Sequence, residues 1–167
     1  MNIVMYHIRR KEQEIVDIKI MKKILASTQY VTIALCKDDE PYLVTLSHGY
    51  DAKQNCIFFH CATEGKKLDY IKANNKTWGQ AMINEGFKDG ECEQHYSSVQ
   101  FRGEVSFLSN VDDKMQALAC MIRQQNENPR PMMTKLEELD PSTGLKNVLI
   151  GRIDIEYLSG KQSEKQT

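Results

Sequence analysis

The chain lacks the features that mark several classes of protein. Among its 167 residues there is one tryptophan, and no apolar run approaches the roughly 20 residues that a membrane span needs. The five cysteines are odd in number and contain no Cys-x-x-Cys spacing, which fits a reducing cytoplasm better than a disulfide framework. The four histidines are dispersed, without a close carboxylate or cysteine pattern. The sequence therefore predicts no metal site.

An excess of charge of one sign is also missing. Lysine and arginine number 22 against 23 acidic residues, which gives a net charge of -1 and a pI near 6.4. Such a chain has no bulk attraction for nucleic acid or for an anionic membrane. The apolar start at residues 1–8 is too short for a signal-peptide core, and its basic residues follow it rather than precede it. We expect a cytoplasmic protein with a small-molecule ligand.

The length of the chain predicts one domain with its own core. A basic arm is expected at residues 1–16, the domain at 17–158, and a polar tail, expected to be disordered, at 159–167. Alternating apolar and β-branched residues predict six strands, at 30–36, 42–50, 56–60, 77–83, 97–108 and 148–158. Gly103 is expected at a bend or bulge of the fifth strand.

Helices are predicted after Asp17 and Asn110, which are good N-cap residues, at 63–73, and in a short stretch at 132–139. Loops of about five residues join the first three strands, too short for a parallel crossover, so these strands form an antiparallel meander. We predict a mainly β fold with flanking helices, a small closed or split antiparallel β-barrel of six strands.

The stretch from His60 to Lys67 joins the third predicted strand to a helix. If Thr63 is the N-cap, Lys66 occupies the third helical position, among free backbone N–H groups. A helix start already carries partial positive charge, so two lysines there favour a bound anion such as a phosphate. The alternative is a solvated lysine pair without function, which the small dipole effect of about 0.3 to 1 kcal/mol per charge allows.

Other residues have a functional and a structural interpretation. His60 could donate a hydrogen bond to a phosphate or to a substrate oxygen, and is the candidate catalytic residue. Cys61 could be reactive beside a helix start, but a small buried side chain is the favoured interpretation. His48 is interpreted as a packing residue. Trp78 and Tyr157 are interpreted as core residues, with stacking on a ligand as the alternative.

Several segments together resemble a known family. In order and at similar spacing they are Arg9-Arg10-Lys11, Pro41-Tyr42-x-Val44-x-Leu46, Gly49-Tyr50-Asp51, Phe59-His60 with Gly65-Lys66-Lys67, and Tyr96-Ser97-Ser98-Val99. This ensemble, over residues 9–125, resembles the nitroimidazole-resistance (Nim) branch of the flavin-binding split-barrel proteins related to pyridoxamine phosphate oxidases. The stretch after Asn126 matches nothing in the pattern.

The resemblance implies a six-stranded split barrel that forms a homodimer and holds FMN, or FAD, between two subunits. It implies that Val44, Thr45, Leu46 and Ser47 bind the flavin ring, with Thr45 and Ser47 approaching it partly through backbone groups. His60, Cys61, Ala62 and Thr63 would line the ribityl and phosphate region, Lys66 and Lys67 would hold the phosphate, and Ser98 would lie near the flavin. The pair Ser47-His48 departs from the family pattern, in which a proline or apolar residue is expected nearby.

The implied activity is that of a flavin-dependent oxidoreductase that reduces nitro-aromatic or quinone-like compounds with electrons from NAD(P)H. One alternative is a flavin-binding storage or redox-sensing protein without catalysis. Another is a pyridoxamine phosphate oxidase-like enzyme, although an arginine-bearing C-terminal substrate motif is not found in this sequence. A third is haem binding, with His48 or His60 as the axial ligand.

Overall fold

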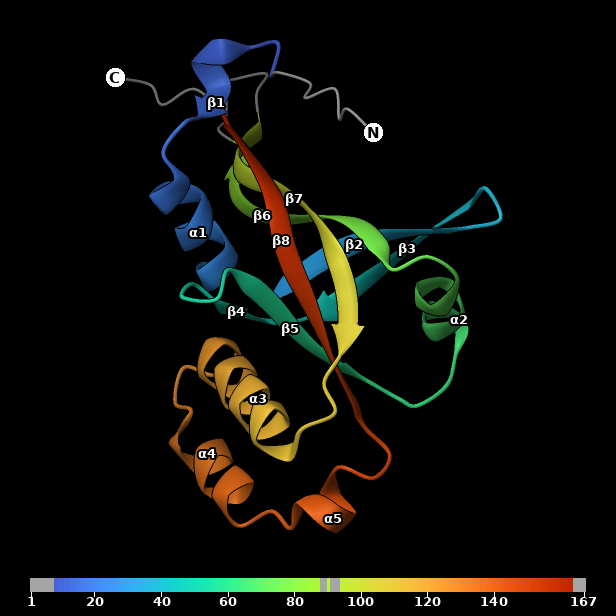
Figure 1. Ribbon diagram of the computed structural model, residues 1–167. Coiled ribbons are helices and arrows are strands. Elements are labelled where there is room, and N and C mark those ends of the chain that lie inside the picture. Colours follow the sequence, from blue (N-terminus) through green and yellow to red (C-terminus); the bar gives the residue numbers. More distant parts are fainter. Residues whose placement is uncertain (1–7, 88–89, 91–93, 164–167) are drawn as a thin grey trace.

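One antiparallel sheet of eight strands carries the fold, and the computed structural model describes residues 8–87, 90 and 94–163 (Figure 1). The strands are β1 (Glu14–Ile15), β2 (Tyr30–Lys37), β3 (Glu40–Ser47), β4 (Gly49–Asp51), β5 (Cys56–Cys61), β6 (Lys76–Phe87), β7 (Gln94–Phe107) and β8 (Leu149–Gln162). The helices are a 3-10 turn (Lys11–Gln13), α1 (Ile18–Ser27), α2 (Lys66–Ala73), α3 (Val111–Gln125), α4 (Arg130–Glu137) and α5 (Pro141–Gly144).

The two edges of the sheet are joined through one residue. The strand order is β3-β2-β6-β7-β8-β5-β4, with β1 beside β8, so β3 and β4 lie at opposite ends of the order. In the sequence only His48 separates them. The sheet must therefore curl until its edges meet at His48, although β3 and β4 are not hydrogen-bonded to each other. This is the split barrel that the sequence predicts.

Alternation along the strands divides the sheet into an inner and an outer face. Val31, Ile33 and Leu35 of β2 are fully buried on the inner face, together with Val99 and Phe101 of β7. Side chains of α1 and α2 complete this core, including Met21, Ile24, Leu25, Tyr70 and Ile71. A second, smaller core lies under α3, where Ala117 and Met121 cover Cys56, Phe58 and Ile150. Burial of these side chains is the main stabilising contribution to the fold.

Helix starts follow the predicted capping chemistry at two places. The Asp17 side chain accepts a hydrogen bond from the Lys19 backbone N–H, and Asn110 accepts two, from Asp112 and Asp113. Each cap satisfies donors that the first turn of a helix leaves free. The predicted bulge is also present, because the pairing of β7 with β8 shifts register between Arg102 and Gly103.

Several predicted boundaries were wrong. The second predicted strand is broken at His48 into β3 and β4. The arm was expected to end at residue 16, but Glu14 and Ile15 pair with Lys161 and Gly160 of β8. The tail was expected from residue 159, but β8 continues to Gln162. Residues 1–7 and 164–167 lie outside the described part of the chain.

The buried side chain of His48 fastens the seam between β3 and β4. Its Nε2 lies 3.0 Å from the Leu25 carbonyl oxygen at the end of α1. Gln124 of α3 donates to the carbonyls of Leu25 and Thr28 and accepts from the Tyr50 backbone N–H, which ties α1, α3 and β4 together. His48 Nδ1 is buried without a hydrogen-bond partner among the described residues. The interpretation of His48 as a packing residue agrees with this environment.

Stability is expected to fall in weak acid because of His48. Burial lowers the pKa of His48 below the ordinary 6.5, against smaller opposing effects of the backbone groups of Leu25 and Gln29. The unfolded chain therefore takes up a proton first, so the contribution is complete above pH 6.5 and is lost as the pH falls toward the folded pKa. The slope from this group reaches at most about 1.4 kcal/mol per pH unit.

Urea unfolding of wild type, His48→Asn and His60→Asn between pH 7.5 and 5 measures this effect. His48→Asn should lose the slope, while His60→Asn, which changes an exposed histidine, should keep it. Equal slopes in wild type and His48→Asn would contradict the assignment.

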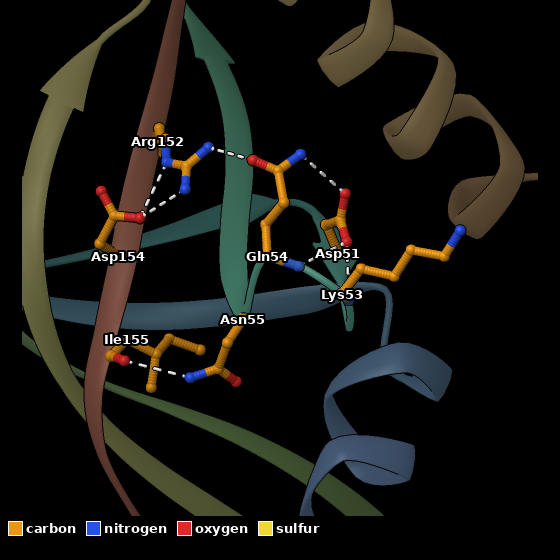
Figure 2. A network of polar contacts seen from close by, with 7 residues as sticks. All are labelled: Asp51, Lys53, Gln54, Asn55, Arg152, Asp154 and Ile155. Atoms are coloured by element: carbon orange, nitrogen blue, oxygen red, sulfur yellow. Dashed lines mark hydrogen bonds and ion pairs between the residues drawn. The ribbon is translucent and has the colours of Figure 1, made fainter.

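A polar network fixes the β4-β5 turn to β8 (Figure 2). Arg152 donates to Asp154 at 2.8 Å and to the Gln54 side chain at 2.6 Å, and the Gln54 amide donates in turn to Asp51. Asn55 donates to the Ile155 carbonyl at 3.1 Å. The Arg152 guanidinium is therefore occupied by groups of its own chain. We assign it a structural role rather than that of an anion site.

Candidate functional site

The outer face of β3, β2, β6 and β7 presents large apolar side chains to solvent. Tyr30, Leu43, Trp78 and Met82 are 46% to 67% exposed. The pairing of the strands places them in two rows that cross the sheet. In one row Ala34 lies between Leu43 and Trp78, and in the other Ser47 pairs with Tyr30 and Met82 pairs with Ser98. Between them runs a polar row, Thr45-Thr32-Gln80-Gln100. An exposed apolar surface of this kind marks a ligand site or an interface.

A groove of about 550 Å³ follows these rows. It is lined by Tyr30, Thr32, Ala34, Leu43, Trp78, Gly79, Gln80, Met82 and Gln100. No carboxylate, lysine, arginine or histidine is among these lining residues. Its size lies within the roughly 300 to 1,000 Å³ of small-molecule sites, and its mixture of apolar walls with a few amides and hydroxyls is typical of them.

The corner after β5 begins a helix later than predicted. Thr63 was expected to be the N-cap, but the N-cap of α2 is Gly65, so Lys66 is the first helical residue rather than the third. Gly65 has φ 127° and ψ 165°, a conformation that glycine adopts without strain. The first helical hydrogen bond runs from Leu68 N to Gly65 O. The backbone N–H groups of Lys66 and Lys67 find no acceptor among the described residues, as the start of a helix requires.

The two lysine side chains point to different aromatic rings. Lys66 Nζ lies 4.6 Å from the centroid of the Tyr42 ring and 5.4 Å from that of Tyr70, whereas Lys67 Nζ lies 5.9 Å from that of Phe59. Neither ammonium forms an ion pair with a carboxylate in the part of the chain that is described. Two uncompensated cations beside free N–H donors make this corner electrostatically suited to an anion.

The four predicted flavin-binding residues of β3 divide between the two faces. Thr45 and Ser47 lie on the outer face, and the Thr45 hydroxyl is 3.0 Å from that of Thr32 in the groove wall. Val44 and Leu46 face the core. Because β3 is an edge strand, half of its backbone polar groups point away from β2. Val44 and Leu46 can therefore meet a ligand only through their backbone.

The residues after Phe59 do not converge on one point. His60 is exposed and is not part of the groove of its own chain, while Cys61 packs against the inner core. Burial raises the pKa of the Cys61 thiol, against a smaller opposing effect of the Lys67 ammonium, so the thiol is protonated at neutral pH. This agrees with the packing interpretation of Cys61. Ala62 and Thr63 are exposed at the corner.

Ser98 lies beside the groove, because it pairs with Met82 and is two residues from Gln100. Its hydroxyl donates to the Lys161 carbonyl at 3.2 Å. The interpretation of Trp78 as a core residue was wrong. Trp78 lies on the outer face, where its ring meets the Tyr157 ring edge to face with the two centroids 5.9 Å apart. Sequence reasoning also missed Thr32, Gln80 and Gln100. The only feature that could have indicated them is that each polar residue lies opposite another polar residue on the neighbouring strand. This can be recognised only once the pairing of the strands is known.

Comparison with known proteins identifies the family. The sequence profile described as pyridoxamine 5'-phosphate oxidase matches residues 19–162. The chain belongs to this family. The family resemblance and the split-barrel fold predicted from the sequence are thereby confirmed. No curated protein matches the chain.

Solved structures of family-like proteins share the fold at low sequence identity. A candidate 5-nitroimidazole antibiotic resistance protein from Bacteroides thetaiotaomicron has a TM-score of 0.75 at 18% identity, over 89% of this chain and 86% of that one. The FAD and heme binding protein from Mycobacterium smegmatis has a TM-score of 0.72 at 19% identity, over 92% and 74%. A FAD-binding protein from Mesorhizobium loti has a TM-score of 0.64 at 19% identity, over 89% and 96%.

Two further observations concern a membrane and haem. Within the described residues, no helix combines the length and apolar composition required to cross a membrane.

His48 is fully buried with its Nε2 against the Leu25 carbonyl oxygen. Of the two histidines considered as axial haem ligands, only His60 is therefore accessible.

Proposed function

We propose that this protein is a flavin-dependent oxidoreductase that binds FMN between the two subunits of a homodimer. Its proposed substrates are nitro-aromatic or quinone-like compounds, and NAD(P)H supplies the electrons. The observation that carries the proposal is the apolar groove on the exposed outer face, which reaches the edge strand β3. The Lys66 ammonium lies over Tyr42 of the same strand and has no ion-pair partner among the described residues. Membership of the family and the FAD-binding relatives of the same fold support it.

The residues of the chain fit an elongated ligand with a flat head and an anionic tail. Leu43 lines the groove on the outer face, and the next residue toward the N-terminus, Tyr42, lies under the Lys66 ammonium. A ligand could therefore lie in the groove and pass the edge of β3 to reach the lysines. Lys66, Lys67 and their free N–H groups would hold its phosphate, and Thr45 and Ser98 would orient its ring.

The exposed outer face of the sheet is also the proposed interface with the second subunit. One sheet face with Tyr30, Leu43, Trp78 and Met82 exposed leaves the groove open to solvent on one side. Two copies related by a two-fold axis would cover each other's apolar rows and exclude water from both grooves.

A bound flavin supplies the hydride and electron transfer itself, so the protein contributes binding, orientation and electrostatics. This agrees with a groove whose lining residues include no carboxylate or histidine. His60 remains the proposed donor of a hydrogen bond to a substrate oxygen.

The test is the absorption spectrum of the purified protein, with the released cofactor identified by mass as FMN or FAD. Anaerobic addition of NADH or NADPH should bleach the flavin, and a nitro-aromatic or a quinone should restore the colour faster than buffer alone. A colourless protein that does not bind added FMN would overturn the proposal. Reduction without faster reoxidation by any acceptor would favour a storage or sensing protein, and turnover of pyridoxamine phosphate would favour the oxidase activity.

A further inference from the structure

The two lysines of the corner differ in how they are held. Lys66 is exposed at the first position of α2, yet its ammonium lies over two tyrosine rings from different elements. The Tyr42 ring belongs to β3 and the Tyr70 ring to α2, and their centroids are 5.1 Å apart with an interplanar angle of 53°. Tyr70 is buried and Tyr42 is half-buried, so both rings are fixed by packing in the main core.

This arrangement restricts a side chain that is otherwise among the most mobile. A lysine loses rotamer freedom when it binds a ligand, and a cation held beforehand over aromatic rings loses less. The rings attract the ammonium through the quadrupole of their faces and not as counter-ions, so they neutralise no charge. The ammonium therefore stays available to an anion.

From this geometry we infer that Tyr42 and Tyr70 are positioning residues that hold the Lys66 ammonium ready for the terminal phosphate of the flavin. The inference rests on the proposed function and extends it. The tyrosine pair makes the site discriminate between phosphorylated flavins and riboflavin, which has the same ring and no phosphate. Neither Tyr42 nor Tyr70 is among the lining residues of the groove in which the flavin ring is proposed to lie.

The experiment is a titration of flavin-free protein with FMN and with riboflavin, followed by quenching of flavin fluorescence. Tyr42→Leu should weaken FMN binding about tenfold, the size expected for a partly desolvated cation-π contact, and change riboflavin binding less than about twofold. Tyr42→Phe keeps the ring and should bind FMN within about twofold of wild type. If Tyr42→Leu does not fold, Tyr42→Ile makes the same test with a residue that suits an edge strand.

A double-mutant cycle separates positioning from packing. In the Lys66→Ala background, Tyr42→Leu should have no further effect on FMN binding, because the cation it positions is gone. Additive effects, or equal losses for FMN and riboflavin, would overturn the inference and leave the proposed function intact. If Lys66→Ala itself leaves FMN binding unchanged, it is instead the phosphate assignment of the proposed function that fails.

Discussion

Removal of both corner lysines, Lys66→Ala with Lys67→Ala, is expected to lower the affinity for FMN by about 100-fold or more. Each ammonium is proposed to make a charge-assisted hydrogen bond to the phosphate, and such bonds contribute roughly 1.5 to 3 kcal/mol each. Neither lysine has an ion-pair partner among the described residues, so the double variant strands no buried carboxylate and the fold should be kept. Equilibrium titration with FMN measures the loss.

The matched control is the pair Lys72→Ala with Lys76→Ala, which removes two exposed lysines from the other end of α2 and the start of β6. It changes the net charge by the same amount and should leave FMN binding within about threefold of wild type, as expected for distant screened charges. Riboflavin affinity should be similar in all three proteins. If the variant Lys66→Ala with Lys67→Ala still purifies fully yellow, the phosphate is bound elsewhere.

A charged outer face is expected to abolish both dimer formation and flavin retention. In the variant Leu43→Asp with Met82→Asp, two carboxylates replace apolar side chains that are 67% and 53% exposed. In the proposed dimer they would be buried without partners, which costs several kcal/mol for each charge. Light scattering should give about twice the 19.2 kDa chain mass for wild type and the chain mass itself for the variant. The variant should also purify colourless.

Ile18→Asp is the control for this change. Ile18 is 50% exposed but belongs to α1, which packs on the inner side of the sheet. Because a carboxylate near a helix start is favourable, this variant should fold, dimerise and keep its flavin. A monomeric wild type, or a dimeric yellow double variant, would contradict the proposed interface.

The sequence predicted the elements well because local chemistry determines them. The caps at Asp17 and Asn110, the alternation of β2 and the bulge at Gly103 are all properties of a few neighbouring residues. The break at His48 could not be seen, because His48 continues the face of Val44 and Leu46 in the two-residue spacing of a strand. It arises only when both edges of the sheet meet.

The start of α2 was misplaced for a similar reason. Thr63 has the chemistry of an N-cap, but Gly65 can adopt the positive φ with which the chain enters the helix, and this competes successfully. The face of Trp78 depended on a distant residue: the Phe101 ring fills the space over Gly79, so this inner position of β6 takes no side chain. Trp78, the neighbour of Gly79, lies on the outer face, and no local sequence pattern reveals this.

The place of β8 in the sheet has a consequence for synthesis of the protein. It lies between β7 and β5 and also pairs with β1, so a strand that is synthesised after all the other described strands joins the two halves of the sheet. Until then β7 and β5 each expose an unpaired edge, the kind of surface that promotes aggregation of nascent chains. Closure also brings together Ile15 and Gly160, residues nearly a whole chain length apart, and such high contact order slows folding. A ribosome-stalled chain that ends before β8 should therefore depend on chaperones, and a chain extended through β8 should lose that dependence.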